Sequence, residues 1–231
     1  MKLELPKITA VCMQGVGPNK EMLFREINKR LKLVLPYLLK NFKFHDLILL
    51  SPENPNVEGI NYIYTKPLTY DEYNTWCLHN LSDYVNTDYC ILFQDDGFPL
   101  NPECWRDEFL DYDYVGTPIT EKMGIPFKEE MIGGGGFTLR SKKLIEFTKS
   151  IPRPNQYGNY LNEDTTIVVE YRDEIVDLGM KICPRDIAKY FSLQNPIYQD
   201  ITLYNTFGFH GRDEKLIEVE KIINQRMEQI N

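Results

Sequence analysis

Short apolar segments alternate with longer segments that carry apolar residues at helical spacing. Four of the short segments have the length of buried strands and border on turn-forming residues: 7–14, 45–51, 60–65 and 88–94. Helices are expected at 20–42, with Asn19 as N-cap and Pro36 marking a kink or a break, and at 71–85. This order of strand, helix, strand, strand, helix and strand predicts an α/β fold with a mixed, mainly parallel central sheet flanked by helices.

The second half of the chain predicts shorter elements around a run of four glycines. The glycines lie inside the apolar segment 131–141, and 111–119 is strand-like. Further helices are expected at 101–110, 141–150, 162–179 and 213–230, with Asn101, Ser141 and Asn162 as N-caps of the first three. The chain has no internal repeat and no low-complexity tract, so we expect its 231 residues to form one domain, 1–231.

The composition is that of a globular protein with an acidic surface. Hydrophobic residues make up 42% of the chain, and the formal net charge is −8. This charge argues against a nucleic-acid partner, but an anionic small molecule can still bind through a divalent cation. No apolar run approaches the roughly 20 residues that span a bilayer, and the N-terminus lacks a signal-peptide core. The five scattered cysteines form no C-x-x-C pair, so we expect a cytoplasmic protein without a structural zinc site.

Two aspartates follow the fourth predicted strand in the segment LFQDDG at 92–97. In open α/β sheets, ligands bind at the carboxyl ends of strands near the point where the strand order reverses, and Asp95 and Asp96 occupy such an end. A carboxylate there can hold a hard divalent cation. The same residues are also typical of a turn, because Asp-Gly is a strong turn dipeptide. Both interpretations are open from this segment alone.

The four glycines 133–136 admit three interpretations. A linker would have polar flanks, whereas Met131, Ile132 and Phe137 flank this run. A P-loop would close with Gly-Lys-Ser/Thr, whereas Phe137 and Thr138 follow the last glycine. The third interpretation is that a ligand or another backbone approaches closely and excludes side chains, and this one is favoured.

Three further residues are candidates for chemistry. Glu163 and Asp164 open the helix expected at 162–179, where acidic residues complement the helix dipole. Either of them could also act as a general base toward a hydroxyl group. His210 lies between glycines in the segment FGFHG, and imidazole is a common ligand of a metal such as manganese. A purely structural role remains the alternative for each of these residues.

The order of these features resembles the glycosyltransferase-A fold. The segments LFQDDGF, DYDYVGTP, GGGGFTLRS, NEDTTI and FGFHG together look like a family of glycosyltransferase-like proteins catalogued as a domain of unknown function, with patterns close to F-Q-x-D, D-Y-x-G-x-P, G-N-G-G-x-S-L-R-S and E-D. The resemblance covers residues 60–212 and departs from the family at Gly134, where Asn is usual, and at Thr138, where Ser is usual. At longer range the chain resembles the fringe and core-1 galactosyltransferases. The implied fold is Rossmann-like, with a nucleotide-binding half at 1–100 and an acceptor-binding half at 101–231.

The resemblance implies a metal site after the fourth strand. Asp96 takes the third, metal-binding position of a D-x-D triplet, and His210 matches the late histidine that completes the site. Together they imply Mn²⁺ or Mg²⁺ as the cofactor. Gln94 stands where the first aspartate is usual, which implies a contact with the donor, and Asp95 falls at the variable middle position on the donor side.

The remaining candidates receive donor and catalytic roles from the same resemblance. Gly134 and Gly135 would pass under the donor sugar, and Arg140 would lie near the diphosphate or be structural. Asp164 matches the carboxylate that deprotonates the acceptor in inverting members of the fold. Glu163 would hold acceptor hydroxyl groups.

The activity expected from the resemblance is that of a metal-dependent, inverting glycosyltransferase of the hexosyltransferase type. It would move a sugar from a nucleotide-sugar, with a UDP-sugar favoured, to a glycan or glycoconjugate hydroxyl. Two alternatives remain. A catalytically inactive carbohydrate-binding module could use the 15 tyrosines and two tryptophans as sugar-stacking surfaces. A nucleotidyltransferase of similar fold would carry a basic glycine-rich loop after the first strand, where GVGPNK offers only Lys20. The oligomeric state is not predicted.

Overall fold

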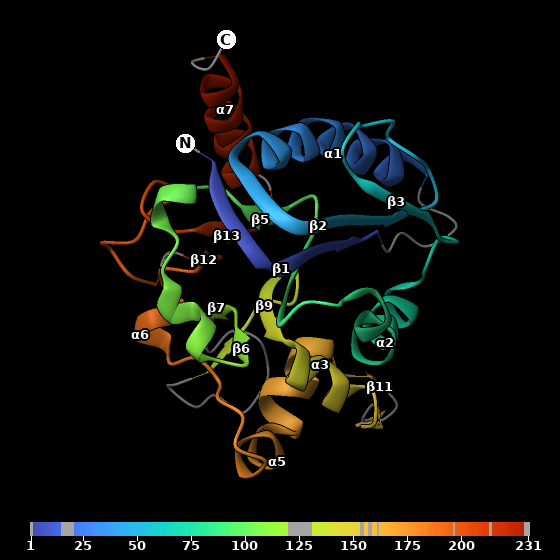
Figure 1. Ribbon diagram of the computed structural model, residues 1–231, viewed down its shortest axis with the longest axis vertical. Coiled ribbons are helices and arrows are strands. Elements are labelled where there is room, and N and C mark those ends of the chain that lie inside the picture. Colours follow the sequence, from blue (N-terminus) through green and yellow to red (C-terminus); the bar gives the residue numbers. More distant parts are fainter. Residues whose placement is uncertain are drawn as a thin grey trace.

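The computed structural model describes residues 2–14, 21–119, 131–152, 155–156, 159–160, 162–195, 197–212 and 214–228. Its centre is a six-stranded sheet with the strand order β3-β2-β1-β4-β9-β6 (Figure 1). The bounds of these strands are β1 Leu3–Met13, β2 Phe42–Ser51, β3 Asn61–Tyr64, β4 Tyr89–Phe93, β6 Tyr114–Val115 and β9 Phe137–Ser141. Strands β1 to β4 run parallel, and β9 runs antiparallel to β4. The predicted α/β fold with a mainly parallel sheet is therefore confirmed.

The order of the sheet reverses between β1 and β4. From β1 the chain moves outward to β2 and β3 on one side, and then returns to pair β4 with the other edge of β1. In sheets of this kind the crevice at the carboxyl ends of the two strands beside the reversal is the usual ligand site. The segment that follows Phe93 therefore begins at this crevice.

Helices cover both faces of the sheet. Their bounds are α1 Glu21–Asn41, α2 Tyr70–His79, α3 Lys142–Thr148, α4 Glu163–Thr165, α5 Arg172–Asp177, α6 Arg185–Ala188 and α7 Glu214–Glu228. Because side chains alternate along a strand, Ala10 and Cys12 of β1 pack in the core cluster that contains α1. Val11 and Met13 pack on the other face with residues of α2 and α3. Figure 1 shows α1 on one side of the sheet and α2 and α3 on the other.

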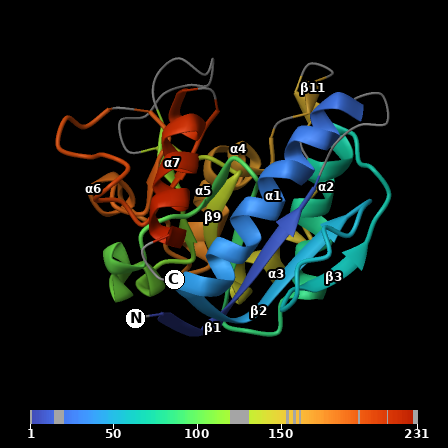
Figure 2. The same ribbon diagram turned by 90° about the horizontal axis from the view of Figure 1, so that it is seen from above.

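The two long helices lie next to each other. Helix α1 continues through Pro36 to Asn41, so the proline does not break it. Figure 2 shows α7 beside α1, where Arg226 donates a hydrogen bond to the hydroxyl of Tyr37 at 3.1 Å. Among the helices in the described part of the chain, none is long and apolar enough to cross a membrane. The expected N-cap Asn19 lies outside the described residues.

Three smaller sheets complete the fold. The first has the order β12-β13-β5, the second pairs β7 with β8, and the third pairs β10 with β11. Their bounds are β5 Gly97–Pro99, β7 Thr117–Pro118, β8 Ile132–Gly133, β10 Asn155–Gln156, β11 Asn159–Tyr160, β12 Ser192–Leu193 and β13 Gly208–His210. The antiparallel pairing of β5 with β13 joins the segment after β4 to a segment much later in the chain.

Three helices expected from the sequence take other forms. The helix expected at 71–85 ends at His79 and is followed by a 3₁₀ turn at Leu81–Tyr84. The helix expected at 101–110 is replaced by two 3₁₀ turns, Pro102–Cys104 and Asp107–Asp111. The side chain of Asn101 donates instead to the carbonyl oxygens of Leu203 and Thr206, at 2.7 and 2.6 Å. The helix expected at 162–179 is divided by a π-helical turn at Thr166–Glu170, which separates α4 from α5. Single π turns inside helices are frequent at functional sites.

Candidate active site

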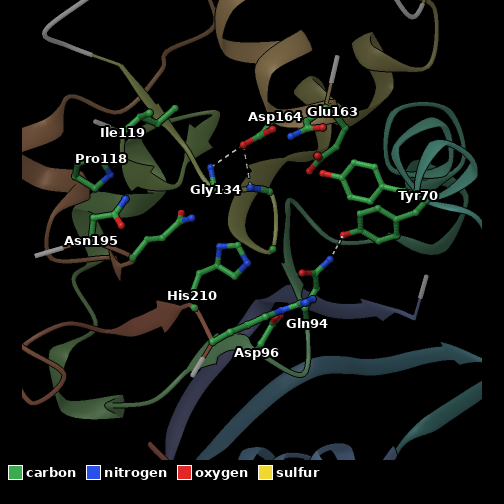
Figure 3. Close-up of a pocket in the computed structure, with 17 residues that line it drawn as sticks. Tyr70, Gln94, Asp96, Pro118, Ile119, Gly134, Glu163, Asp164, Asn195 and His210 are labelled. Atoms are coloured by element: carbon green, nitrogen blue, oxygen red, sulfur yellow. Dashed lines mark hydrogen bonds and ion pairs between the residues drawn. The ribbon is translucent and has the colours of Figure 1, made fainter. Parts of the chain in front are cut away.

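A cavity of about 420 Å³ opens at the carboxyl end of β4 (Figure 3). Its walls come from segments that are far apart in the sequence: the turn after β4, the glycine run, the start of α4 and the end of β13. Seven of the residues selected from the sequence line it: Gln94, Asp96, Gly134, Gly135, Glu163, Asp164 and His210. A cavity of this volume is large enough for a small-molecule ligand.

Asp95 and Asp96 occupy the tip of a tight turn that follows β4. The N–H of Gln94 donates to the carbonyl of Gly97 at 2.8 Å, and the reverse bond measures 3.2 Å, which confirms the turn interpretation for the backbone. The side chains diverge. Asp95 accepts from Nε of Arg30 on α1 at 2.7 Å, whereas Asp96 lines the cavity. Burial and the charge of Asp96 raise the pKa of Asp95, and Arg30 opposes them.

His210 reaches this turn because β13 pairs with β5. In the antiparallel register His210 lies opposite Gly97. The N–H of Gly211 donates to the carbonyl oxygen of Asp96 at 2.8 Å, which fixes the two segments against each other. A Cβ on Gly97 would lie only 2.8 Å from Cδ2 of His210, so the imidazole packs directly on this glycine. Asp96 and His210 are therefore neighbours in space although they are far apart in the sequence.

Two polar atoms beside this contact are buried. Oδ1 of Asp96 and Nδ1 of His210 have no hydrogen-bond partner among the described residues, whereas buried polar groups are nearly always paired. Oδ2 of Asp96 accepts from Nε of Arg212 at 2.6 Å. Burial is the largest effect on His210 and lowers its pKa below the ordinary value of 6.5, against the charge of Asp96. The neutral imidazole, which is the form that binds metals, is therefore favoured at neutral pH.

These two residues fit a divalent cation. A carboxylate oxygen and an imidazole nitrogen form a mixed donor set that suits Mn²⁺, while Mg²⁺ prefers oxygen. Within the described ranges, no group of three or more His, Cys, Asp or Glu side chains is arranged to hold a metal ion. A cation held by Asp96 and His210 would therefore need further ligands from water or from a bound substrate. Metal binding stays a prediction, and the two buried polar atoms support it.

The glycine run is required by the side chains that approach it. A Cβ on Gly136 would overlap Nε2 of His210 and lie 2.6 Å from Oε1 of Gln94. A Cβ on Gly135 would overlap the carboxylate of Glu163. Side chains are therefore excluded at these two positions, as expected from the sequence, but the groups that approach closely are side chains of the cavity wall rather than a ligand or a second backbone.

Asp164 is held in place by backbone N–H groups. Its Oδ2 accepts from Gly134 at 2.8 Å and from Gly135 at 3.2 Å, and its Oδ1 accepts from Thr165 at 2.8 Å. Gly134 has a φ of +82°, a conformation that glycine adopts without strain. In Figure 3, Asp164 and Asp96 lie on opposite sides of His210. A carboxylate with a fixed position beside a cavity could act as a general base toward a hydroxyl group bound there.

Glu163 and Arg140 form a buried ion pair behind the glycine run. Nη2 of Arg140 lies 2.7 Å from Oε1 of Glu163, and the Arg140 side chain is fully inaccessible to solvent. Arg140 also donates to Oγ1 of Thr138 at 3.0 Å and lies over the ring of Tyr114. Burial and the charge of Asp164 raise the pKa of Glu163, and Arg140 opposes them. The expected donor contact of Arg140 is therefore corrected. Its guanidinium is enclosed and does not line the cavity, so Arg140 takes the structural role that was the alternative.

Helix α2 contributes two residues that sequence reasoning missed. The hydroxyl of Tyr73 accepts from Nε2 of Gln94 at 2.8 Å, and Oδ1 of Asn74 accepts from the N–H of Glu163 at 3.0 Å. Asn74 is fully buried, although it lies in a helix that is expected from the spacing of its apolar residues. A polar residue on the buried side of such a helix is the signal that could have identified it, because a buried amide requires partners.

A comparison with protein families matches residues 60–210 to a family described as "Protein of unknown function (DUF5672)". The matched segment covers more than half of the chain. The chain belongs to the DUF5672 family. The segment shared with this family ends at His210 and includes the seven cavity residues selected from the sequence, whereas Arg30 and Arg212 lie outside it. A search among curated proteins gave no match to this DUF5672 chain.

Comparison with solved structures gives matches to glycosyltransferases. The crystal structure of a glycosyltransferase involved in the glycosylation of the major capsid of PBCV-1 has a TM-score of 0.55 and 16% identity, and the match covers 95% of this chain and 100% of that one. Glycosyltransferase GlyE of Streptococcus pneumoniae TIGR4 has a TM-score of 0.46 and 11% identity, over 97% of this chain and 64% of that one. At 16% identity the first match establishes that this DUF5672 protein has a glycosyltransferase-like fold.

Proposed function

We propose that this DUF5672 protein is a metal-dependent, inverting glycosyltransferase that moves a sugar from a nucleotide-sugar, with a UDP-sugar favoured, to a hydroxyl group of a glycan or glycoconjugate. The observation that carries the proposal is that Asp96, His210 and Asp164 line one cavity at the reversal of the strand order. The fold shared with the glycosyltransferase of PBCV-1 capsid glycosylation supports the same class. In this proposal 1–100 contributes to nucleotide binding, whereas 101–231 binds the acceptor and also supplies His210 and the glycine run to the donor side.

Asp96 and His210 form the donor side of the proposed site. Oδ1 of Asp96 and the imidazole of His210 would hold Mn²⁺ or Mg²⁺, and their buried polar atoms support this assignment. When bound, the cation supplies positive charge that stabilises the diphosphate leaving group. Gln94, fixed by its bond to Tyr73, would contact the donor beside them. Gly134 lines the same cavity, so the donor sugar would lie against its backbone.

Asp164 forms the acceptor side of the proposed site. Its carboxylate would take the proton from the acceptor hydroxyl as that oxygen attacks the anomeric carbon. Inversion requires attack from the face opposite the leaving group, and the positions of Asp164 and Asp96 on opposite sides of His210 are consistent with this requirement. Tyr70 lines the same cavity and is largely exposed, so its ring could stack on a sugar of the acceptor. The inactive carbohydrate-binding module and the nucleotidyltransferase receive no comparable support.

The test measures release of nucleoside diphosphate from a panel of nucleotide-sugars in the presence of Mn²⁺. Asp164→Asn should lower turnover by about 10²–10⁴-fold, which is the usual contribution of a general base, while donor affinity measured by calorimetry stays nearly unchanged. Asp177→Asn, at an exposed position of α5, is the matched control and should retain full turnover. Full turnover in Asp164→Asn would remove this residue from the mechanism. Failure of the wild-type protein to bind any nucleotide would contradict the proposed function.

A further inference from the structure

Three buried carboxylates in or next to the site each have an arginine partner, and the three pairs differ in exposure. Asp95 pairs with Arg30, and Glu163 pairs with Arg140, with both members of each pair buried or nearly so. The third pair joins Asp96 to Arg212, and its two members differ in solvent exposure. The carboxylate is 3% exposed, whereas the arginine side chain is 64% exposed. Arg212 therefore reaches inward from the cavity edge to neutralise a buried charge.

We propose that Arg212 exchanges its partner when the donor binds: it leaves Asp96 to the divalent cation and takes the diphosphate of the nucleotide instead. This inference rests on the proposed function and extends it to a residue outside the segment that matches the family. It assigns Arg212 two successive partners, both anionic. Without donor or cation it pairs with Asp96, and in the donor complex it binds phosphate oxygens.

The charges at Asp96 make the exchange favourable only when both ligands are present. A buried carboxylate without a counter-charge is strongly destabilised, so Arg212 is needed at Oδ2 while the site lacks a cation. A divalent cation on the same carboxylate would repel the guanidinium across a distance of a few ångströms. The diphosphate then offers negative oxygens to which arginine can bind in bidentate fashion. The cation and Arg212 therefore compete for Asp96 in the free protein and cooperate on the nucleotide.

The position of Arg212 allows this movement. Its side chain is mostly exposed, and it lines the cavity that also contains Asp96 and His210. The backbone next to it is anchored, because the N–H of Gly211 donates to the carbonyl of Asp96. Lys215 is a poorer candidate for the same task, since its ammonium is half-buried and donates to the carbonyl of Gln194. An exposed arginine side chain on a fixed backbone can change partners without moving the rest of the site.

The experiment measures two affinities that the proposal predicts will change in opposite directions. The affinity for Mn²⁺ alone is measured by electron paramagnetic resonance, and the affinity for UDP at saturating Mn²⁺ by calorimetry. Arg212→Ala should bind Mn²⁺ alone roughly tenfold more tightly or better, because a charge-assisted bond no longer competes for Asp96. The same variant should bind UDP with Mn²⁺ roughly tenfold more weakly or worse. Arg25→Ala, an exposed arginine of α1, is the control and should match the wild type.

The outcomes separate this inference from the proposed function. Both affinities falling together in Arg212→Ala would indicate a merely structural role and would overturn the exchange, and so would two unchanged affinities. In either case, transfer of sugar by the wild-type protein would leave the proposed function intact. Absence of Mn²⁺ binding in both the wild type and the variant would overturn the exchange together with the metal site. Arg212→Gln repeats the measurement without the charge and guards against a folding defect in the alanine variant.

Discussion

Removal of the Arg140 charge should destabilise the whole domain. Arg140→Met preserves most of the side-chain volume but leaves the Glu163 carboxylate buried without its counter-charge. The two groups lie 2.7 Å apart and are almost completely inaccessible to solvent, so water cannot replace the lost partner. Breaking a buried ion pair by removal of one partner typically destabilises a protein by about 3–5 kcal/mol.

The expected shift in Tm follows from this magnitude. In a chain of this size about 1 kcal/mol corresponds to about 2–4 °C, so Arg140→Met should lower Tm by about 6–20 °C. Addition of Glu163→Gln to the same protein removes the unpaired charge and should restore part of the lost stability. Groups in direct contact commonly show coupling energies of about 0.5–3 kcal/mol in such cycles. Thermal and guanidinium unfolding of the wild type, both single variants and the double variant complete the measurement.

A matched control comes from an exposed arginine. Arg106 lies 3.2 Å from Glu108 in a pair whose two side chains are each 41% exposed, and it also lies over the ring of Tyr190. Arg106→Met should therefore lower stability by only about 1–2 kcal/mol, since exposed ion pairs and cation–aromatic contacts each contribute about 1 kcal/mol or less. An equal loss in Arg140→Met and Arg106→Met, or purely additive effects in the Arg140 and Glu163 cycle, would refute the reasoning.

Two further predictions test the glycine run and the start of α2. Gly136→Ala should abolish nucleotide binding measured by calorimetry, because its Cβ would displace His210. Gly179→Ala is the control: the φ of +74° brings strain but no described atom lies within 4 Å, so this variant should lose stability and retain binding. Equal binding by both variants would contradict this prediction. Glu72→Gln should remove a pH-dependent part of stability. The bond from Lys66 is the main cause that lowers the pKa of Glu72 to about 2, so the wild type should exceed the variant in Tm above pH 4.5 and lose this advantage as the pH falls toward 2. An advantage that stays constant from pH 6 to pH 2 would oppose that explanation.

The sequence predicted the N-terminal strands because buried parallel strands read as continuous apolar runs. The helix predicted at 101–110 is wrong, because contacts with residues far away in the sequence outweigh the local helix-start signal. Asn101 followed by proline is typical of a helix start. Its amide is instead bound to the carbonyls of Leu203 and Thr206, which lie far away in the sequence. No pattern around Asn101 contains that information.

The sequence indicated seven of the residues that line the cavity, but it did not indicate their pairings. The order of motifs resembling a known family indicated Asp96 and His210, and the pairing of β5 with β13 brings them together. The arginine partners could not be assigned in the same way. Arg30, Arg140 and Arg212 lie on α1, on β9 and after β13, and only the folded chain brings each to its carboxylate. Whether a charged residue binds a substrate or neutralises a neighbour is decided by these contacts.

The most direct test of the proposed metal-dependent donor site is anomalous X-ray scattering from crystals grown with Mn²⁺ and UDP. The predicted result is an anomalous manganese peak within bonding distance of both Asp96 and His210, with the diphosphate of UDP beside it in the same cavity. A manganese peak that touches neither side chain, or UDP bound with its diphosphate away from both, would contradict the account.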